Sequence, residues 1–157
     1  MDTLTSDFSS LYGTSADFAY WMFDDCSVKN FNASLSGLSE INNLGFDYNS
    51  PLENFKSDLS SLTEMPDFFM YNQHIKTFEA DLGKLTNLDE MFQSSSIESF
   101  KTSATGYLYS ANRMFENCHK FYNFEASLDE LAIASRMFYS TALSTFDRNL
   151  SYLSTAN

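Results

Sequence analysis

The sequence is poor in glycine, histidine and basic residues. Its 157 residues include five Gly, two His and nine Lys plus Arg. Five glycines leave little to cradle a phosphate group, and no nucleophile-elbow, phosphate-loop or zinc-protease motif occurs. Only His74 and His119 could act as neutral-pH bases or imidazole ligands, and neither sits at a metal-site spacing. We therefore expect no metal, no cofactor and no enzymatic activity.

The shortage of basic residues also bears on partners and membranes. Against nine basic residues stand 21 acidic ones, a formal net charge of −12, which repels nucleic-acid phosphates and anionic lipid headgroups. No stretch reaches the roughly 18 apolar residues that a membrane span needs. The first ten residues carry Asp2 and Asp7 and no apolar run, unlike a secretory signal. We expect no nucleic-acid partner, no membrane insertion and no signal peptide in this chain.

What the sequence has in abundance is phenylalanine at a fixed period. Twelve of the 16 Phe residues fall into two series whose members recur about every 23 residues. The first series is Phe23, Phe46, Phe69, Phe92, Phe115 and Phe138; the second is Phe31, Phe55, Phe78, Phe100, Phe124 and Phe146. Small differences of spacing within each unit cancel, so the total length per unit is conserved, as stacked coils require.

Apolar residues accompany the second series at constant offsets. Four and seven positions after each Phe stand Leu35 and Leu38, Leu59 and Leu62, Leu82 and Leu85, Ala104 and Tyr107, Leu128 and Leu131, Leu150 and Leu153. This spacing also matches two turns of helix, so a short helix or 3₁₀ turn within each coil stays open. A purely helical repeat is disfavoured because such units need about 33 residues or more. Aromatic rings at coil spacing predict a core, not a ligand site.

One unit resembles a known family. The segment Met114-Phe115-Glu116-Asn117-Cys118-His119-Lys120-Phe121-Tyr122-Asn123-Phe124 is similar to the 23-residue leucine-rich repeat of BspA-like bacterial surface proteins, which also has phage-encoded versions. The resemblance implies one solenoid over 1–157, with about six coils and an atypical N-terminal repeat in 1–22. It implies a right-handed coil, a parallel sheet of short strands on one face, and irregular or short helical returns.

The resemblance also places the strands around the second Phe series. Phe124 and Ala126 should then point inward and Asn123, Glu125 and Ser127 outward. The exposed face would comprise Asn30, Asn32, Ser34, Asn54, Lys56, Asp58, Thr77, Glu79, Asp81, Ser99, Lys101, Ser103, Asn123, Glu125, Ser127, Thr145, Asp147 and Asn149. A solvated sheet surface is the plain interpretation. The functional one is a binding surface formed by Asn54, Lys56, Asp58, Thr77, Glu79, Asp81, Ser99, Lys101, Asn123 and Glu125.

Three further features concern the cysteines and the two ends. Cys26 and Cys118 lie four repeats apart, roughly 19 Å in a stack of strands, so we expect two buried free thiols. The segment Thr5–Leu11 echoes Lys56–Leu62, with extra loop residues expected near Phe18–Trp21. The segment from Leu150 onward shows no polar cap, which suggests either a fragment or an end covered by another molecule.

Two hypotheses of function follow. The first is an adhesion or protein-binding module, extracellular or on a cell surface, that uses the exposed sheet. The alternative is a structural component of a phage virion or surface assembly. Such a component would associate end to end through Leu150, Leu153 or the edge at Leu4.

Overall fold

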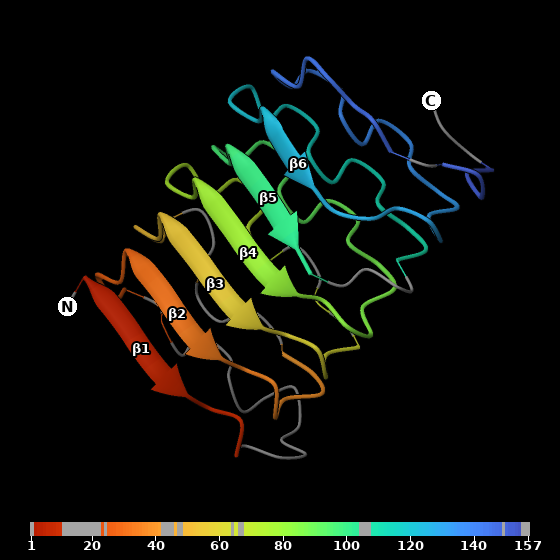
Figure 1. Ribbon diagram of the computed structural model, residues 1–157. Helices are drawn as coiled ribbons and strands as arrows, with labels where there is room; N and C mark the ends of the chain where they lie inside the picture. The colour runs from red at the N-terminus through yellow and green to blue at the C-terminus, as the bar shows by residue number, and fades with distance from the viewer. Residues whose placement is uncertain are drawn as a thin grey trace.

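The chain forms a solenoid built on one parallel sheet (Figure 1). The computed structural model describes residues 2–10, 23, 25–41, 46, 49–63, 65, 68–103, 108–148 and 150–154. The sheet has six strands, and their order in space is their order in the sequence. The strands are β1 (Thr3–Asp7), β2 (Asn30–Ser34), β3 (Asn54–Asp58), β4 (Thr77–Asp81), β5 (Ser99–Thr102) and β6 (Asn123–Glu125). The predicted repeat solenoid with a parallel sheet on one face is confirmed.

One equivalent position on each strand defines the register of the sheet. Leu4, Phe31, Phe55, Phe78, Phe100 and Phe124 pair in register from β1 to β6. Side chains alternate along each strand, so each of these residues points into the coil and its two neighbours point out. The inward placement predicted for Phe124 and Ala126 is confirmed, since both are buried.

Two columns of phenylalanine rings form the core. Along the strands, consecutive rings from Phe31 to Phe124 lie 5.0 to 5.7 Å apart with planes within 13°. Along the return turns, rings from Phe23 to Phe138 lie 5.2 to 6.4 Å apart with planes within 6°. The two columns meet edge to face; Phe78 and Phe92, for example, lie at 75°. Each such pair stabilises the fold by about 0.5–1.5 kcal/mol beyond the burial of its apolar area. The two columns therefore hold successive coils together.

The return turns are irregular, and the described residues contain no helix. Two residues after the turn phenylalanine the backbone is left-handed, at Tyr71, Ser94, Asn117 and Ser140. A left-handed conformation costs a non-glycine residue roughly 1–2 kcal/mol. At the first three of these residues, hydrogen bonds to the next coil offset that cost. The N–H groups of Tyr71, Ser94 and Asn117 donate to carbonyl oxygens one repeat on, as from Tyr71 to Gln93 at 2.9 Å.

The N-terminal segment forms β1 with Leu4 in the position of the phenylalanine, which is the alignment that the echo of Lys56–Leu62 in Thr5–Leu11 predicts. The C-terminal end of the sheet differs from the expectation. The segment around Phe146, expected to be a strand, forms none, and Phe146 is 39% exposed. The physical reason is Arg148: earlier coils place a small residue such as Ala80 or Ala126 there, which points inward, and a guanidinium cannot be buried in that core.

Thr145 and Asp147 are accordingly exposed but are not part of the sheet. The loop at Phe18–Trp21 and the predicted positions of Ala104, Tyr107 and Asn149 lie outside the described residues. Both cysteines are free, as expected; Cys118 is buried, whereas Cys26 is only partly buried.

The phenylalanine columns yield a stability prediction. Phe92 is fully buried within its column, so Phe92→Ala should lower the free energy of unfolding by about 3–5 kcal/mol. Phe146→Ala should cost about 1 kcal/mol because that ring is half-exposed. Urea unfolding followed by circular dichroism measures both. Equal losses for the two variants would contradict the assignment of the core.

Candidate functional site

The outward face of the sheet carries three parallel columns of polar side chains. The first column begins the strands (Asn30, Asn54, Thr77, Ser99, Asn123), the middle column follows (Asn32, Lys56, Glu79, Lys101, Glu125), and the last column ends them (Ser34, Asp58, Asp81, Ser103, Ser127). The structure brings all ten predicted binding residues together on this face. The three columns differ in how far their polar groups are already used.

The first column is a hydrogen-bonded ladder. Asn54 Nδ2 donates to Asn30 Oδ1 at 2.7 Å, and Thr77 Oγ1 donates to Asn54 Oδ1 at 2.7 Å. Further along, Asn123 Nδ2 donates to Ser99 Oγ at 3.0 Å. These side chains hold neighbouring strands together, and several of their donors and acceptors already form hydrogen bonds within the protein.

The last column ends the strands. The Asp58 carboxylate accepts from Ser60 N at 2.9 Å, and the Asp81 carboxylate accepts from Gly83 N at 2.9 Å. Such bonds two residues along the chain form Asx turns. Gly83 has a φ of 29°, and a Cβ there would lie 2.4 Å from the Ser60 carbonyl oxygen, so glycine permits the close approach of the two coils. Asp58 and Asp81 therefore have a structural role.

The middle column alternates in charge. Lys56, Glu79, Lys101 and Glu125 follow one another on β3 to β6. Lys56 Nζ donates to Glu79 Oε1 at 2.9 Å, with 60% and 47% of the two side chains exposed. This hydrogen bond is the main reason that the pKa of Glu79 lies below its ordinary value, and the charges of Lys56 and Lys101 add to the effect. Charged groups of this column remain accessible to a partner.

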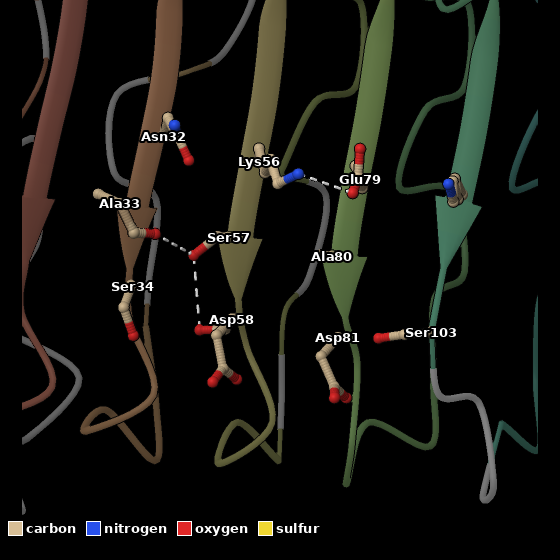
Figure 2. A pocket seen from close by; sticks show the side chains of 11 residues that line it. Asn32, Ala33, Ser34, Lys56, Ser57, Asp58, Glu79, Ala80, Asp81 and Ser103 are labelled. Carbon is tan, nitrogen blue, oxygen red and sulfur yellow. Dashed lines mark hydrogen bonds and ion pairs between the residues drawn. The ribbon is translucent and has the colours of Figure 1, made fainter.

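A shallow depression of about 390 Å³ covers the sheet from β2 to β5. Figure 2 shows Lys56, Asp58, Glu79, Asp81 and Ser103 around it. Ser57 is the buried residue of its lining that has a polar side chain, and Ser57 Oγ donates to the Ala33 carbonyl oxygen at 2.7 Å. The floor leaves no orphaned polar group at Ser57, so the charges at the rim carry any recognition.

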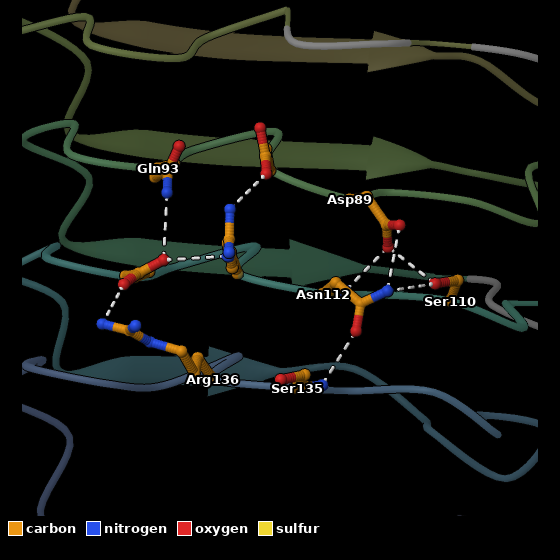
Figure 3. A network of polar contacts seen from close by, with 9 residues as sticks. Asp89, Gln93, Ser110, Asn112, Ser135 and Arg136 are labelled. Carbon is orange, nitrogen blue, oxygen red and sulfur yellow. Dashed lines mark hydrogen bonds and ion pairs between the residues drawn. The ribbon is translucent and has the colours of Figure 1, made fainter. Parts of the chain in front are cut away.

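A second polar network, not predicted from the sequence, joins the return turns (Figure 3). The Asp89 carboxylate accepts from Asn112 N and Ser110 Oγ, both at 2.7 Å. Asn112 Oδ1 accepts in turn from Ser135 N at 2.9 Å. The spacing of 23 between residues 89, 112 and 135 was the available signal. This network fixes adjacent turns.

Glu116 lies at the centre of the same region. Its side chain is 6% exposed and makes ion pairs with Arg136 and, at 3.6 Å, with Arg113. Gln93 Nε2 donates to Glu116 Oε2, the oxygen that also faces Arg113, at 3.0 Å. A carboxylate this buried needs such partners, since an unpaired buried charge is costly. The cluster therefore accounts for two of the nine basic residues of the chain.

The groups that could support catalysis are few in the described part of the chain. There, no group of three or more His, Cys, Asp or Glu side chains is arranged to hold a metal ion. Burial raises the pKa of the Cys118 thiol to about 11, which disfavours the nucleophilic thiolate. His119 Nδ1 lies 3.0 Å from the Ser140 carbonyl oxygen, and His74 is exposed. No helix among the described residues is long and apolar enough to cross a membrane.

Comparisons of this chain with family models, with curated proteins and with solved structures gave no match. The resemblance to BspA-like repeats therefore stays a prediction.

The middle column yields a prediction about protonation. Lys56→Met removes the main donor to Glu79, so the pKa of Glu79 should rise toward its ordinary value of 4.5. In the native chain the folded-state pKa is the lower one. The small stabilisation from this pair is therefore present above the unfolded-state pKa and is lost as the pH falls through the folded-state pKa. Side-chain carboxyl NMR titration measures the shift. An unchanged pKa of Glu79 in the variant would contradict the prediction.

The buried cluster around Glu116 yields a prediction about stability. Glu116→Ala removes the carboxylate that Arg113, Arg136 and Gln93 share, and should cost about 2 kcal/mol of unfolding free energy. Glu90→Ala is the matched control, because Glu90 pairs with Arg113 at 3.1 Å but is 34% exposed, and should cost less than about 1 kcal/mol. Urea denaturation compares them, and the reverse order would refute the structural role of Glu116.

Proposed function

We propose that this chain is a non-enzymatic protein-binding module that uses the middle column of its sheet. The observation that supports this is the unequal use of the three columns. The first is engaged in holding strands and Asp58 and Asp81 of the last in ending them, whereas Lys56, Glu79, Lys101 and Glu125 present accessible charge. The site is therefore narrower than the ten residues predicted from the sequence.

The alternation of charge indicates the chemistry of the partner. Neighbouring strands lie about 4.8 Å apart, so like charges in the column recur about every 10 Å along the solenoid. A polar protein segment with acidic groups facing Lys56 and Lys101 and basic groups facing Glu79 and Glu125 fits this pattern. The contacts are exposed and weak singly, so binding should draw on several at once and weaken with salt.

The proposed setting is extracellular, on a cell surface or in a virion. It rests on the resemblance of Met114–Phe124 to repeats of bacterial surface proteins and their phage-encoded versions. A host protein or a neighbouring subunit is the proposed partner.

A second candidate is a structural unit of a virion or surface assembly. The observation that favours it is an apolar cavity of about 350 Å³ at the C-terminal coil. Its lining includes Leu128, Leu131, Met137, Phe146, Leu150 and Leu153. The predicted end residues Leu150 and Leu153 are thus partly buried around a space that a neighbouring molecule could fill.

The sheet proposal can be tested with peptides selected on the native chain from a displayed random library. For the selected peptides, Glu79→Lys with Lys101→Glu should weaken affinity at least about tenfold, because one negative and one positive position of the column are reversed while net charge is unchanged. Lys84→Glu with Glu130→Lys is the matched control on exposed positions outside the column. Equal affinities for both double variants would reject the middle column as the site.

A further inference from the structure

The two edges of the sheet are chemically different. In each inner strand, the outward residues bond to the preceding strand and the inward residues to the following one. Thr77 N, for instance, donates to the Glu53 carbonyl oxygen at 3.1 Å, and Leu59 N donates to the Asp81 carbonyl oxygen at 2.9 Å. Because this alternation holds along a parallel ladder, it tells which backbone groups face outward at each edge.

At the C-terminal edge, Arg148 occupies the groups that a further strand would need. The inward residues Phe124 and Ala126 of β6 face that edge. Arg148 Nε donates to the Ala126 carbonyl oxygen at 2.9 Å, and Nη2 donates to the Phe124 carbonyl oxygen at 2.9 Å. A third bond, from Nη1 to the Asp147 carbonyl oxygen at 2.7 Å, fixes the guanidinium. A charged side chain therefore blocks strand addition to β6.

At the N-terminal edge, β1 has no such protection from the described residues. Asn30 N donates to the Asp2 carbonyl oxygen and Phe8 N donates to the Ser34 carbonyl oxygen, so the opposite set, Thr3, Thr5 and Asp7, faces away from β2. These three residues are exposed. The strand contains neither proline nor lysine, the residues that usually discourage edge pairing.

We infer that β1 is a self-association edge that pairs antiparallel with β1 of a second copy about a two-fold axis at Thr5. Parallel stacking of β1 on β6 of another copy would need the Phe124 and Ala126 carbonyl oxygens, which Arg148 already binds. The self-pairing that remains joins β1 of one copy to β1 of another. Such an isologous contact closes as a dimer and does not propagate into a fibre.

The side chains of β1 suit this pairing. Around an axis at Thr5, Thr5 faces its own counterpart, Thr3 faces Asp7, and Leu4 faces Ser6. The strand's only charged residue, Asp7, then lies opposite a hydroxyl, so no like charges meet. Pairing would also cover Leu4 and Phe8, which are only partly buried. This inference makes the second candidate function specific and is independent of the middle column.

Light scattering after size-exclusion chromatography, over a wide concentration range, tests the dimer. The native chain should dimerise, and Thr5→Pro should be monomeric, because it removes an N–H that faces the partner but none that bonds to β2. Thr5→Val keeps the N–H and should remain dimeric. A native chain that is monomeric at every concentration, or a dimeric Thr5→Pro, would overturn the inference.

Two more variants guard against a folding defect. In a Cys26→Ser background, Thr5→Cys should form a disulfide-linked dimer on mild oxidation, because the axis brings the two Cα atoms within about 5.5 Å. Thr3→Cys should not, and equal cross-linking at both positions would refute the register.

Arg148→Ala should open the C-terminal edge and give species larger than a dimer, and adding Thr5→Pro should abolish these larger species. If Arg148→Ala gives only the dimer, the argument that selects like edges fails.

Discussion

Equal coil length is the constraint on which this structure depends. Backbone hydrogen bonds between coils and stacked rings both require each residue to lie over its counterpart about 23 residues on, as Phe69 lies over Phe92. A change of length in one return would displace the ring, the turn ladder and the strand register together. Tyr71, Ser94 and Asn117 are tolerated in the left-handed conformation for the same reason, because their N–H groups donate hydrogen bonds to the next coil that offset the local strain.

The same constraint divides the polar residues into two kinds. Asn, Thr and Asp that recur at coil spacing bond to their counterparts or to turn N–H groups, and they extend the stacking into the surface. Lys56, Glu79, Lys101 and Glu125 also recur but alternate in sign, which relieves the repulsion that identical charges would suffer at strand spacing. A regular charge pattern is thus compatible with stability and with recognition at once.

The fold could be predicted because a period of phenylalanines reports directly on stacking. The first strand could be predicted as well, because Thr5–Leu11 repeats the pattern of Lys56–Leu62 although leucine replaces phenylalanine at Leu4. The absence of a strand at Phe146 could not. Phe146 preserves the pattern, yet Arg148 stands where earlier coils have a small inward residue, and its guanidinium bonds to the carbonyl oxygens of β6 that a seventh strand would use. The residues predicted for the outward face do lie there. The structural role of Asn54 depends on hydrogen bonds between coils, and that of Asp58 and Asp81 on turn geometry, neither of which the repeat pattern reveals.

The contact pattern of the strands also determines how the molecule would respond to load. Each strand contacts only its neighbours in the sheet, so the coils are linked in series along the axis. Tension between the two ends would be carried equally by every intercoil junction, and the weakest junction would yield first while the others stayed intact. Extension would therefore proceed one coil at a time, dissipating work at each rupture, as in a tether that lengthens before it breaks.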